Sequence, residues 1–210
     1  MSKTISQLKW RYATKKFDST KILSPQKLDI LKQAFNLTAT SYGLQTIKML
    51  LIEDKALRKT LVKPAFNQSQ VVDASHLLVL CIQKNILSED VVTYYNNIKS
   101  IRATPENILK PYRENLIETI AKMSIEERQL WSTKQAYIAL GNLMTVCAIE
   151  AIDACPMEGF LPDTFDDILN LKEKELKSVL LLPVGYRAED DMFSEFKKVR
   201  KPLEEAVIEI

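Results

Sequence analysis

Glycine is scarce in this sequence. Only four of the 210 residues are glycine, against a typical usage of roughly 7%. The four are Gly43, Gly141, Gly159 and Gly185. Their spacing leaves no room for a G-x-G-x-x-G dinucleotide fingerprint or a G-x-x-x-x-G-K phosphate loop. A nucleotide site built on a glycine-rich loop is therefore excluded.

Histidine is scarcer still, because His76 is the single one. One histidine cannot form a multi-histidine metal site, and any Ser-His-Asp or Cys-His arrangement would have to use it. We predict no metal site. His76 begins an apolar run, so we expect it to be a structural, hydrogen-bonded residue rather than an acid or base.

Cysteine pairs and long apolar runs are also missing. Cys81, Cys147 and Cys155 are odd in number, lack C-x-x-C spacing and lie in apolar stretches, which predicts reduced thiols in a core and a cytoplasmic protein. The longest apolar run, residues 77–82, is far shorter than the ~20 residues of a membrane span. We expect a soluble protein without a signal peptide and without a membrane partner.

The charge is nearly balanced. A formal net charge of +2 does not favour nucleic acid as a partner, since binders of the phosphate backbone usually carry a clear basic excess. Basic residues nevertheless gather in two segments at opposite ends of the chain, residues 11–16 and 197–201. Two solvated faces are the alternative interpretation of such clusters.

The apolar pattern predicts one domain, residues 1–210, that mixes helices and strands. Continuous apolar runs over residues 48–52, 77–82 and 179–185 are typical of buried strands. A helix should begin at Pro25 after the N-cap Ser24, and most of residues 88–153 should be helical. Residues 201–210 alternate enough to predict a further strand, one that could add to a partner's sheet.

One predicted helix is unusually long. Ser124 and Glu127 form a capping box, and the helical pattern continues for nearly thirty residues. From Ala136 to Ile152 the segment is apolar almost all round, which is typical of a helix in a large core or in a subunit interface. In a chain of this length we expect an interface.

Seven spaced motifs together resemble one family. They are Arg11-Tyr12-Ala13-Thr14-Lys15-Lys16-Phe17, the loop 38–45, Asn67-Gln68 with Asp73-Ala74-Ser75-His76, residues 135–142, Pro156-Met157-Glu158-Gly159-Phe160, Pro183-Val184-Gly185-Tyr186 and Lys198-Val199-Arg200. Their order resembles that of the FMN-dependent nitroreductases, in particular the oxygen-insensitive NAD(P)H nitroreductase and flavin reductase branch. The resemblance extends from about residue 5 to 205.

The resemblance implies an α+β fold with a mixed sheet wrapped by helices. It also implies a homodimer, with long helices at the interface, a C-terminal tail of about residues 201–210 that crosses to the partner, and two FMN sites between the subunits. NADH or NADPH would be the co-substrate, and a small molecule would accept the electrons.

The resemblance implies a set of FMN-binding residues. Without a glycine loop the phosphate needs cationic side chains, and Arg11, Lys198 and Arg200 occupy the matching positions. Lys15 matches a lysine near the ribityl chain and the pyrimidine edge, where a cation stabilises the charge that develops on reduction. Tyr12, Ala13 and Thr14 belong to the same segment.

The remaining matches concern the flavin ring. Asn67 matches an asparagine that hydrogen-bonds the pyrimidine edge. Glu158 and Gly159 match backbone N–H groups that address N5 and O4, while Pro156 and Met157 would pack over one face. Thr40 and Ser41 match small hydroxyl residues that reach the flavin from the second subunit, a role equally open to ordinary loop residues. No catalytic side chain is predicted, because N5 carries the chemistry.

Two departures from the family pattern bear on function. Ala13 stands where the family usually has a serine, which removes one phosphate donor worth about 0.5–1.5 kcal/mol. Gln70 stands where close relatives have a lysine near N1. Both would favour a flavin-binding storage or sensing protein with little turnover over the main hypothesis.

The main hypothesis is a ping-pong enzyme that passes hydride from NAD(P)H to FMN and then to nitroaromatic, quinone or flavin acceptors. A dedicated flavin reductase or a dihydropteridine reductase is a further alternative. A purely helical interaction protein would be colourless. The sequence does not distinguish NADH from NADPH.

Overall fold

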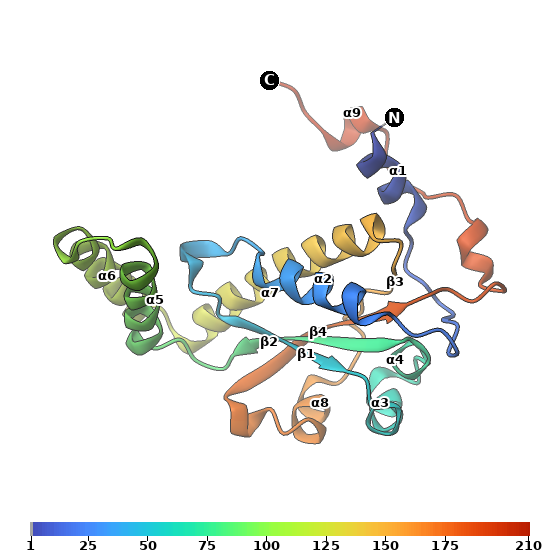
Figure 1. Ribbon diagram of the computed structural model, residues 1–210, viewed down its shortest axis with the longest axis horizontal. Helices are drawn as coiled ribbons and strands as arrows, with labels where there is room; N and C mark the ends of the chain where they lie inside the picture. Colours follow the sequence, from blue (N-terminus) through green and yellow to red (C-terminus); the bar gives the residue numbers. More distant parts are fainter. Residues whose placement is uncertain (1) are drawn as a thin grey trace.

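A computed structural model describes residues 2–210 of the chain (Figure 1). The strands are β1 (Ile47–Ile52), β2 (His76–Gln83), β3 (Asp153–Ala154) and β4 (Leu176–Gly185). The helices are α1 (Lys3–Trp10), α2 (Pro25–Asn36), α3 (Lys55–Val62), α4 (Gln70–Asp73), α5 (Ser88–Arg102), α6 (Glu106–Ala121), α7 (Ile125–Ile149), α8 (Pro162–Ile168) and α9 (Leu203–Ala206). Short 3₁₀ turns include η1 (Ser41–Gly43), η2 (Lys63–Ala65), η3 (Lys172–Lys174) and η4 (Met192–Glu195).

The strands form one sheet in the order β1-β2-β4-β3. Each neighbouring pair of strands is antiparallel, and the pairing of β2 with β4 shifts register between Leu80 and Cys81. The parallel component expected of a mixed sheet is confined to an isolated bridge between Ala13 and Ala154. The α+β class is confirmed.

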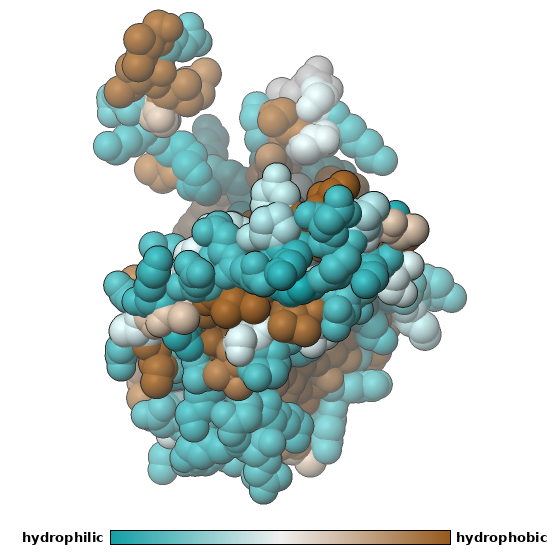
Figure 2. Space-filling model, turned by 90° about the vertical axis from the view of Figure 1, so that its left-hand side faces the viewer, coloured by the Kyte–Doolittle hydropathy of each residue, from teal (hydrophilic) through white to brown (hydrophobic). Residues whose placement is uncertain are grey.

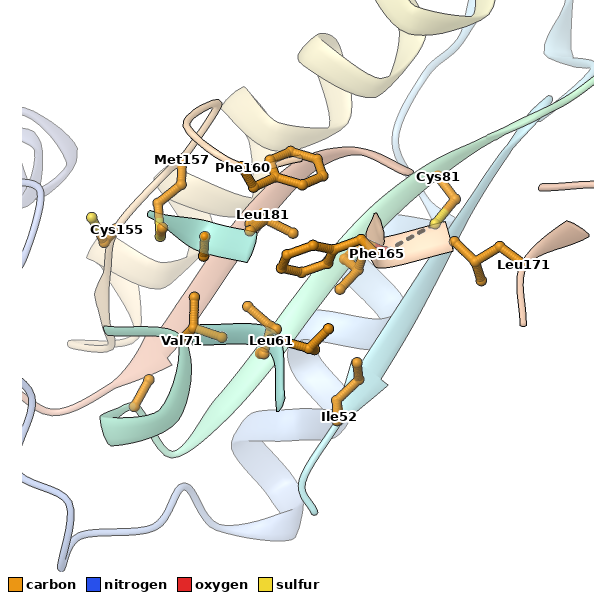
Figure 3. Close-up of a cluster of buried hydrophobic side chains, with 14 of the residues drawn as sticks. Ile52, Leu61, Val71, Cys81, Cys155, Met157, Phe160, Phe165, Leu171 and Leu181 are labelled. Carbon is orange, nitrogen blue, oxygen red and sulfur yellow. Dashed lines mark hydrogen bonds between the residues drawn. The ribbon is translucent and has the colours of Figure 1, made fainter. Parts of the chain in front are cut away.

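Helices cover both faces of the sheet, and each face has its own core. Side chains of β2 alternate between the faces: Leu78 and Leu80 join a cluster with α2 and α7, whereas Leu77 and Val79 join one with α3 and α8 (Figures 1 and 3). A strand covered on both faces must be apolar at every position. This explains the continuous apolar run over residues 77–82.

Helix α7 begins at the predicted capping box and ends at Ile149, which makes it shorter than the nearly thirty residues expected. The Ser124 hydroxyl accepts from the Glu127 N–H at 3.1 Å, and the Glu127 carboxylate accepts from the Ser124 N–H at 2.7 Å. The helix has 25 residues. One side packs on the sheet, while Tyr137 and Ile138 are 46% and 50% exposed. Within one chain, the apolar second half is therefore buried on one side only.

Two structural features differ from the sequence-based expectations. Residues 201–210 do not form the predicted strand: they contain the short helix α9, every residue is exposed, and the apolar tip stands clear of the body (Figure 2). Without a neighbouring strand the segment has no hydrogen-bond partners for an extended form. Helix α8 was not predicted from the sequence, because a helix of seven residues is too short to show a clear helical repeat of apolar side chains.

Candidate functional site

A cationic pocket lies where the two ends of the chain meet. Its volume is about 310 Å³, and its lining is Arg11, Tyr12, Ala13, Lys15, Phe193, Phe196, Lys197, Lys198 and Arg200. Five of these residues are cations, and none of the lining residues is a carboxylate. The structure thus joins the two basic segments from opposite ends of the sequence.

The positive charges of this pocket repel one another, and this repulsion disfavours the charged forms of Arg11 and Lys198. Burial and then the neighbouring Arg200 lower the pKa of Arg11, and burial followed by Arg11 and Arg200 lowers the pKa of Lys198. The ammonium of Lys198 donates to the backbone oxygen of Arg11. Crowded cations with no carboxylate in their lining are suited to an anion with several oxygens, such as a phosphate group.

Thr14 is the exception in the first basic segment. Its side chain is fully buried, its hydroxyl has no hydrogen-bond partner, and its N–H donates to the backbone oxygen of Ala154 at 3.3 Å. Successive side chains of an extended segment point to opposite sides. Ala13 and Lys15 line the pocket and Thr14 does not, so a cofactor contact of Thr14 stays a prediction.

Asp191 joins the two sides of the pocket. This carboxylate is 2% exposed and accepts from the Tyr12 hydroxyl at 2.8 Å and the backbone N–H groups of Lys15 and Lys16 at 2.9 and 3.1 Å. Burial alone would raise the pKa of Asp191, but these donors outweigh it and the pKa is lowered. Asp191 was not among the residues predicted from the sequence, where the Asp190-Asp191 pair before the basic cluster is the available signal.

Arg187 supports the same segment from behind. Its guanidinium lies over the rings of Trp10 and Tyr12, at 4.3 and 4.5 Å from their centroids. It pairs with the buried carboxylate of Asp153 at 2.6 Å. These contacts fix the direction of the chain as it leaves α1. No motif in the sequence predicts them, because Arg187 lies far along the chain from Trp10 and Tyr12.

A second group of predicted residues meets at two adjacent loops. The Gln68 amide donates to the Gly159 backbone oxygen at 2.8 Å and to that of Ala65 at 3.0 Å. Asn67 next to it is exposed and has φ +59°, a left-handed conformation that is costly for a residue with a Cβ. The structure thus places the Asn67 turn beside the Glu158-Gly159 loop.

A residue of α7 holds that loop. The Tyr137 hydroxyl donates to the Glu158 carboxylate, a bond that raises the pKa of Tyr137. Gly159 also has little space, because a Cβ there would lie 3.3 Å from the Gln68 amide nitrogen. The loop is therefore held from both the turn and the helix.

Met157 differs from its expected role. Its backbone pairs with Leu181, at 2.9 and 3.0 Å, and its side chain is 5% exposed within the core (Figure 3). Because side chains alternate along this extended segment, Pro156 and Glu158 lie on the other side. Packing of the Met157 side chain over a cofactor ring is not supported, whereas half-buried Pro156 remains accessible.

Thr40 and Ser41 do not join the pocket within this chain. Thr40 precedes η1 and has a buried hydroxyl without a hydrogen-bond partner. The Ser41 N–H donates to the Gln135 side chain of α7 at 2.8 Å. This loop is thus anchored to the long helix.

His76, the remaining residue with possible acid–base chemistry, has a structural role. His76 is 1% exposed and its Nδ1 lies 2.8 Å from the Ser75 hydroxyl, while burial lowers its pKa. Within residues 2–210 no three histidine, cysteine or acidic side chains gather as a metal site would require. In the same range, no helix is long and apolar enough to cross a membrane.

The fold and the site define an α+β protein with a cationic pocket between its chain ends. The Nitroreductase family model matches residues 8–186, so the chain belongs to the nitroreductase family. A provisionally named NAD(P)H nitroreductase of Staphylococcus aureus is 32% identical over 190 residues, covering 86% of this chain and 85% of that protein.

Solved structures share the fold. A provisionally named nitroreductase from Bacillus subtilis superposes with a TM-score of 0.87 at 18% identity, covering 98% of both chains. A nitroreductase from Exiguobacterium sibiricum, solved in complex with FMN, has a TM-score of 0.82 at 18% identity and covers 100% of this chain and 98% of its own.

Proposed function

We propose that this chain is an FMN-dependent NAD(P)H oxidoreductase. The observation that carries the proposal is the pocket in which five cations converge without a carboxylate in its lining. FMN ends in a phosphate of nearly two negative charges, and Arg and Lys side chains stabilise such a group. Membership of the nitroreductase family and the FMN complex of a fold neighbour support the assignment.

The remaining site residues fit the rest of the cofactor. Residues 154–159 run from the bridge with Ala13 to the bond between Gly159 and Gln68. Fully extended, these five steps span at most about 18 Å, which leaves room for a flavin lying from the pocket to the Asn67 turn. Arg11, Lys198 and Arg200 would hold the phosphate, Lys15 the ribityl side, and Asn67 and the 158–159 backbone the ring.

When bound, FMN would supply the redox chemistry by taking hydride from NAD(P)H at N5 and passing electrons to nitroaromatic, quinone or flavin acceptors in a ping-pong sequence. The protein's own residues bind and orient the cofactor. Lys15 adds positive charge on the side where reduction creates negative charge. Tyr137 and Gln68 keep the 158–159 backbone in one position.

We further propose that the protein is a homodimer. Thr40 and Ser41 lie apart from the cationic pocket of their own chain, so a second copy would have to bring them to a flavin. The exposed Tyr137 and Ile138 of α7 and the exposed apolar tail supply contact surface. A cytoplasmic location stays a prediction from the three unpaired cysteines.

The test is the absorption spectrum of the purified protein, followed by release and identification of the flavin. We expect bound FMN, NADH- or NADPH-dependent reduction of menadione, and loss of most of the flavin in Arg200→Ala. Lys174→Ala, a lysine outside the pocket, is the control and should retain FMN.

Three results would change the assignment. A colourless protein that does not retain added FMN contradicts it. An unchanged flavin content in Arg200→Ala contradicts the phosphate site. A bound flavin that NAD(P)H reduces but only oxygen reoxidises would favour storage or sensing.

A further inference from the structure

Asp191 is buried and accepts four hydrogen bonds. Its Oδ2 accepts from the Tyr12 hydroxyl and the N–H groups of Lys15 and Lys16, and its Oδ1 accepts from the Phe193 N–H at 3.2 Å. The N–H donors come from both chain ends. The carboxylate itself is not among the pocket-lining residues. It therefore lies behind the pocket and contributes to its shape.

These bonds connect the two segments that carry the cations. Residues 11–15 supply the cations Arg11 and Lys15, and residues 193–200 supply the other three cations of the lining. η4 has only 4 residues and the chain after it is exposed. Asp191 thus stands where the second segment leaves the body of the protein.

We propose that Asp191 is a positioning residue for the phosphate group of the cofactor: it holds the 11–16 and 193–200 segments together so that their cations converge. This inference rests on the proposed function. Charged acceptors form stronger hydrogen bonds than neutral ones. Asparagine has the same shape, but its single acceptor oxygen cannot serve both the three donors at Oδ2 and the Phe193 N–H.

The experiment compares two ligands in Asp191→Asn. FMN and riboflavin share the ring and the ribityl chain and differ in the phosphate, so the ratio of their dissociation constants reports on the phosphate site alone. We expect the FMN dissociation constant to rise about tenfold or more and that of riboflavin to stay within about twofold, since the loss concerns charge-assisted contacts. Fluorescence titration of each ligand measures both.

Asp190→Asn is the matched control. Asp190 is adjacent, but its side chain is 69% exposed and pairs only with the exposed Lys16. We expect both dissociation constants to be unchanged there, because exposed ion pairs contribute little. Tyr12→Phe provides a second variant if Asp191→Asn does not fold; it removes one of the donors, and a rise in the FMN constant of about threefold is expected.

The outcomes separate the two proposals. Wild-type protein that binds FMN no better than riboflavin contradicts the phosphate site and hence the proposed function. If wild-type protein prefers FMN and Asp191→Asn keeps that preference while its melting temperature falls, Asp191 is merely structural and the inference is wrong. If the dissociation constants of FMN and riboflavin rise by the same factor in Asp191→Asn, the inference is also wrong.

Discussion

At the scale of single residues, the buried side chain of Arg58 connects two segments of the chain. Arg58 of α3 is 3% exposed, and burial lowers its pKa. Its guanidinium donates to the backbone oxygens of Glu53, Val72 and Ala74, the last at 2.6 Å. Glu53 precedes α3 in the chain, whereas Val72 and Ala74 lie at the end of α4 and directly after it. Arg58 therefore holds α3 against the end of α4 without any carboxylate contact.

Arg58→Met should lower the free energy of unfolding by about 2–4 kcal/mol, because the buried carbonyl group of Ala74 and the partly buried ones of Glu53 and Val72 lose their donor at once. Urea unfolding followed by circular dichroism measures the change. Lys59→Met, at the exposed neighbouring position, should change stability by less than about 0.5 kcal/mol. Equal effects of the two substitutions would disprove the role given to Arg58.

The three cysteines should be unreactive toward alkylating reagents in the folded protein. Burial raises the pKa of Cys81 and of Cys147 to about 12, and it raises the pKa of Cys155 as well. The thiolate is the reactive form. At pH 8.5 we expect no alkylation by iodoacetamide in the native protein and three labels per chain in urea, counted by mass spectrometry.

The same shifts predict a pH dependence. Because the folded pKa values are raised, the stability that the thiols contribute is complete below the ordinary thiol pKa of about 8.5 and is lost as the pH rises above it. Unfolding midpoints should therefore fall between pH 8.5 and 10. Rapid labelling of any one cysteine in native protein would contradict the buried positions.

At the scale of elements, the two faces of α7 have different roles: one packs against the sheet and the other is exposed. Its buried face includes Ala136, Ala139 and Leu143, each 0% exposed and packed against the sheet. Its exposed face carries Ile138 beside Tyr137, which holds the Glu158 loop. An apolar side chain at this place is expected to pack against a second subunit.

Ile138→Glu should therefore convert the proposed dimer into a monomer, since a carboxylate in an apolar interface is costly. Sedimentation velocity measures the change, with far-UV circular dichroism as the check of folding. Ile22→Glu is the matched control, because Ile22 is similarly exposed (56%) but lies in the loop before α2. A dimer that persists in Ile138→Glu would show that α7 is not the interface.

At the scale of the whole molecule, the chain ends come together and then diverge. Residues 11–15 and 193–200 line the cationic pocket, while the tail beyond it rises from the body (Figures 1 and 2). Leu203 and Ile208 of this tail are 74% and 83% exposed. Apolar side chains at the end of an extended arm are suited to a partner surface.

Removal of residues 202–210 should leave the fold of the subunit intact. None of these residues is buried, so the loss of subunit stability should be below about 0.5 kcal/mol. We expect the dimer to dissociate at higher protein concentration than the full chain does, as measured by sedimentation equilibrium. A truncated chain with unchanged dimer affinity would exclude the tail from the interface.

Local sequence alone determined much of the fold. The capping box at Ser124 and Glu127, the Ser24-Pro25 helix start and the apolar run 77–82 each act through neighbouring residues or through complete burial. Their outcome therefore depends little on the rest of the chain. The family motifs likewise pointed to the two basic segments and to the Asn67 and Glu158-Gly159 loops.

Only the tertiary structure decided which side chains meet. The Asp190-Asp191 pair is visible in the sequence, but the donors to Asp191, Tyr12 and the N–H groups of Lys15 and Lys16, lie far away in the chain, so the pair does not reveal its contacts. Arg58 likewise gains its role only where the fold brings the carbonyl groups of Val72 and Ala74 to it. Thr14 and Met157 sit within motifs that suggested cofactor contact, but the alternation of an extended chain turns both side chains inward. The predicted strand at the tail is instead a short exposed helix, because a strand needs a neighbour to satisfy its backbone and residues 201–210 lie beside none of the four strands.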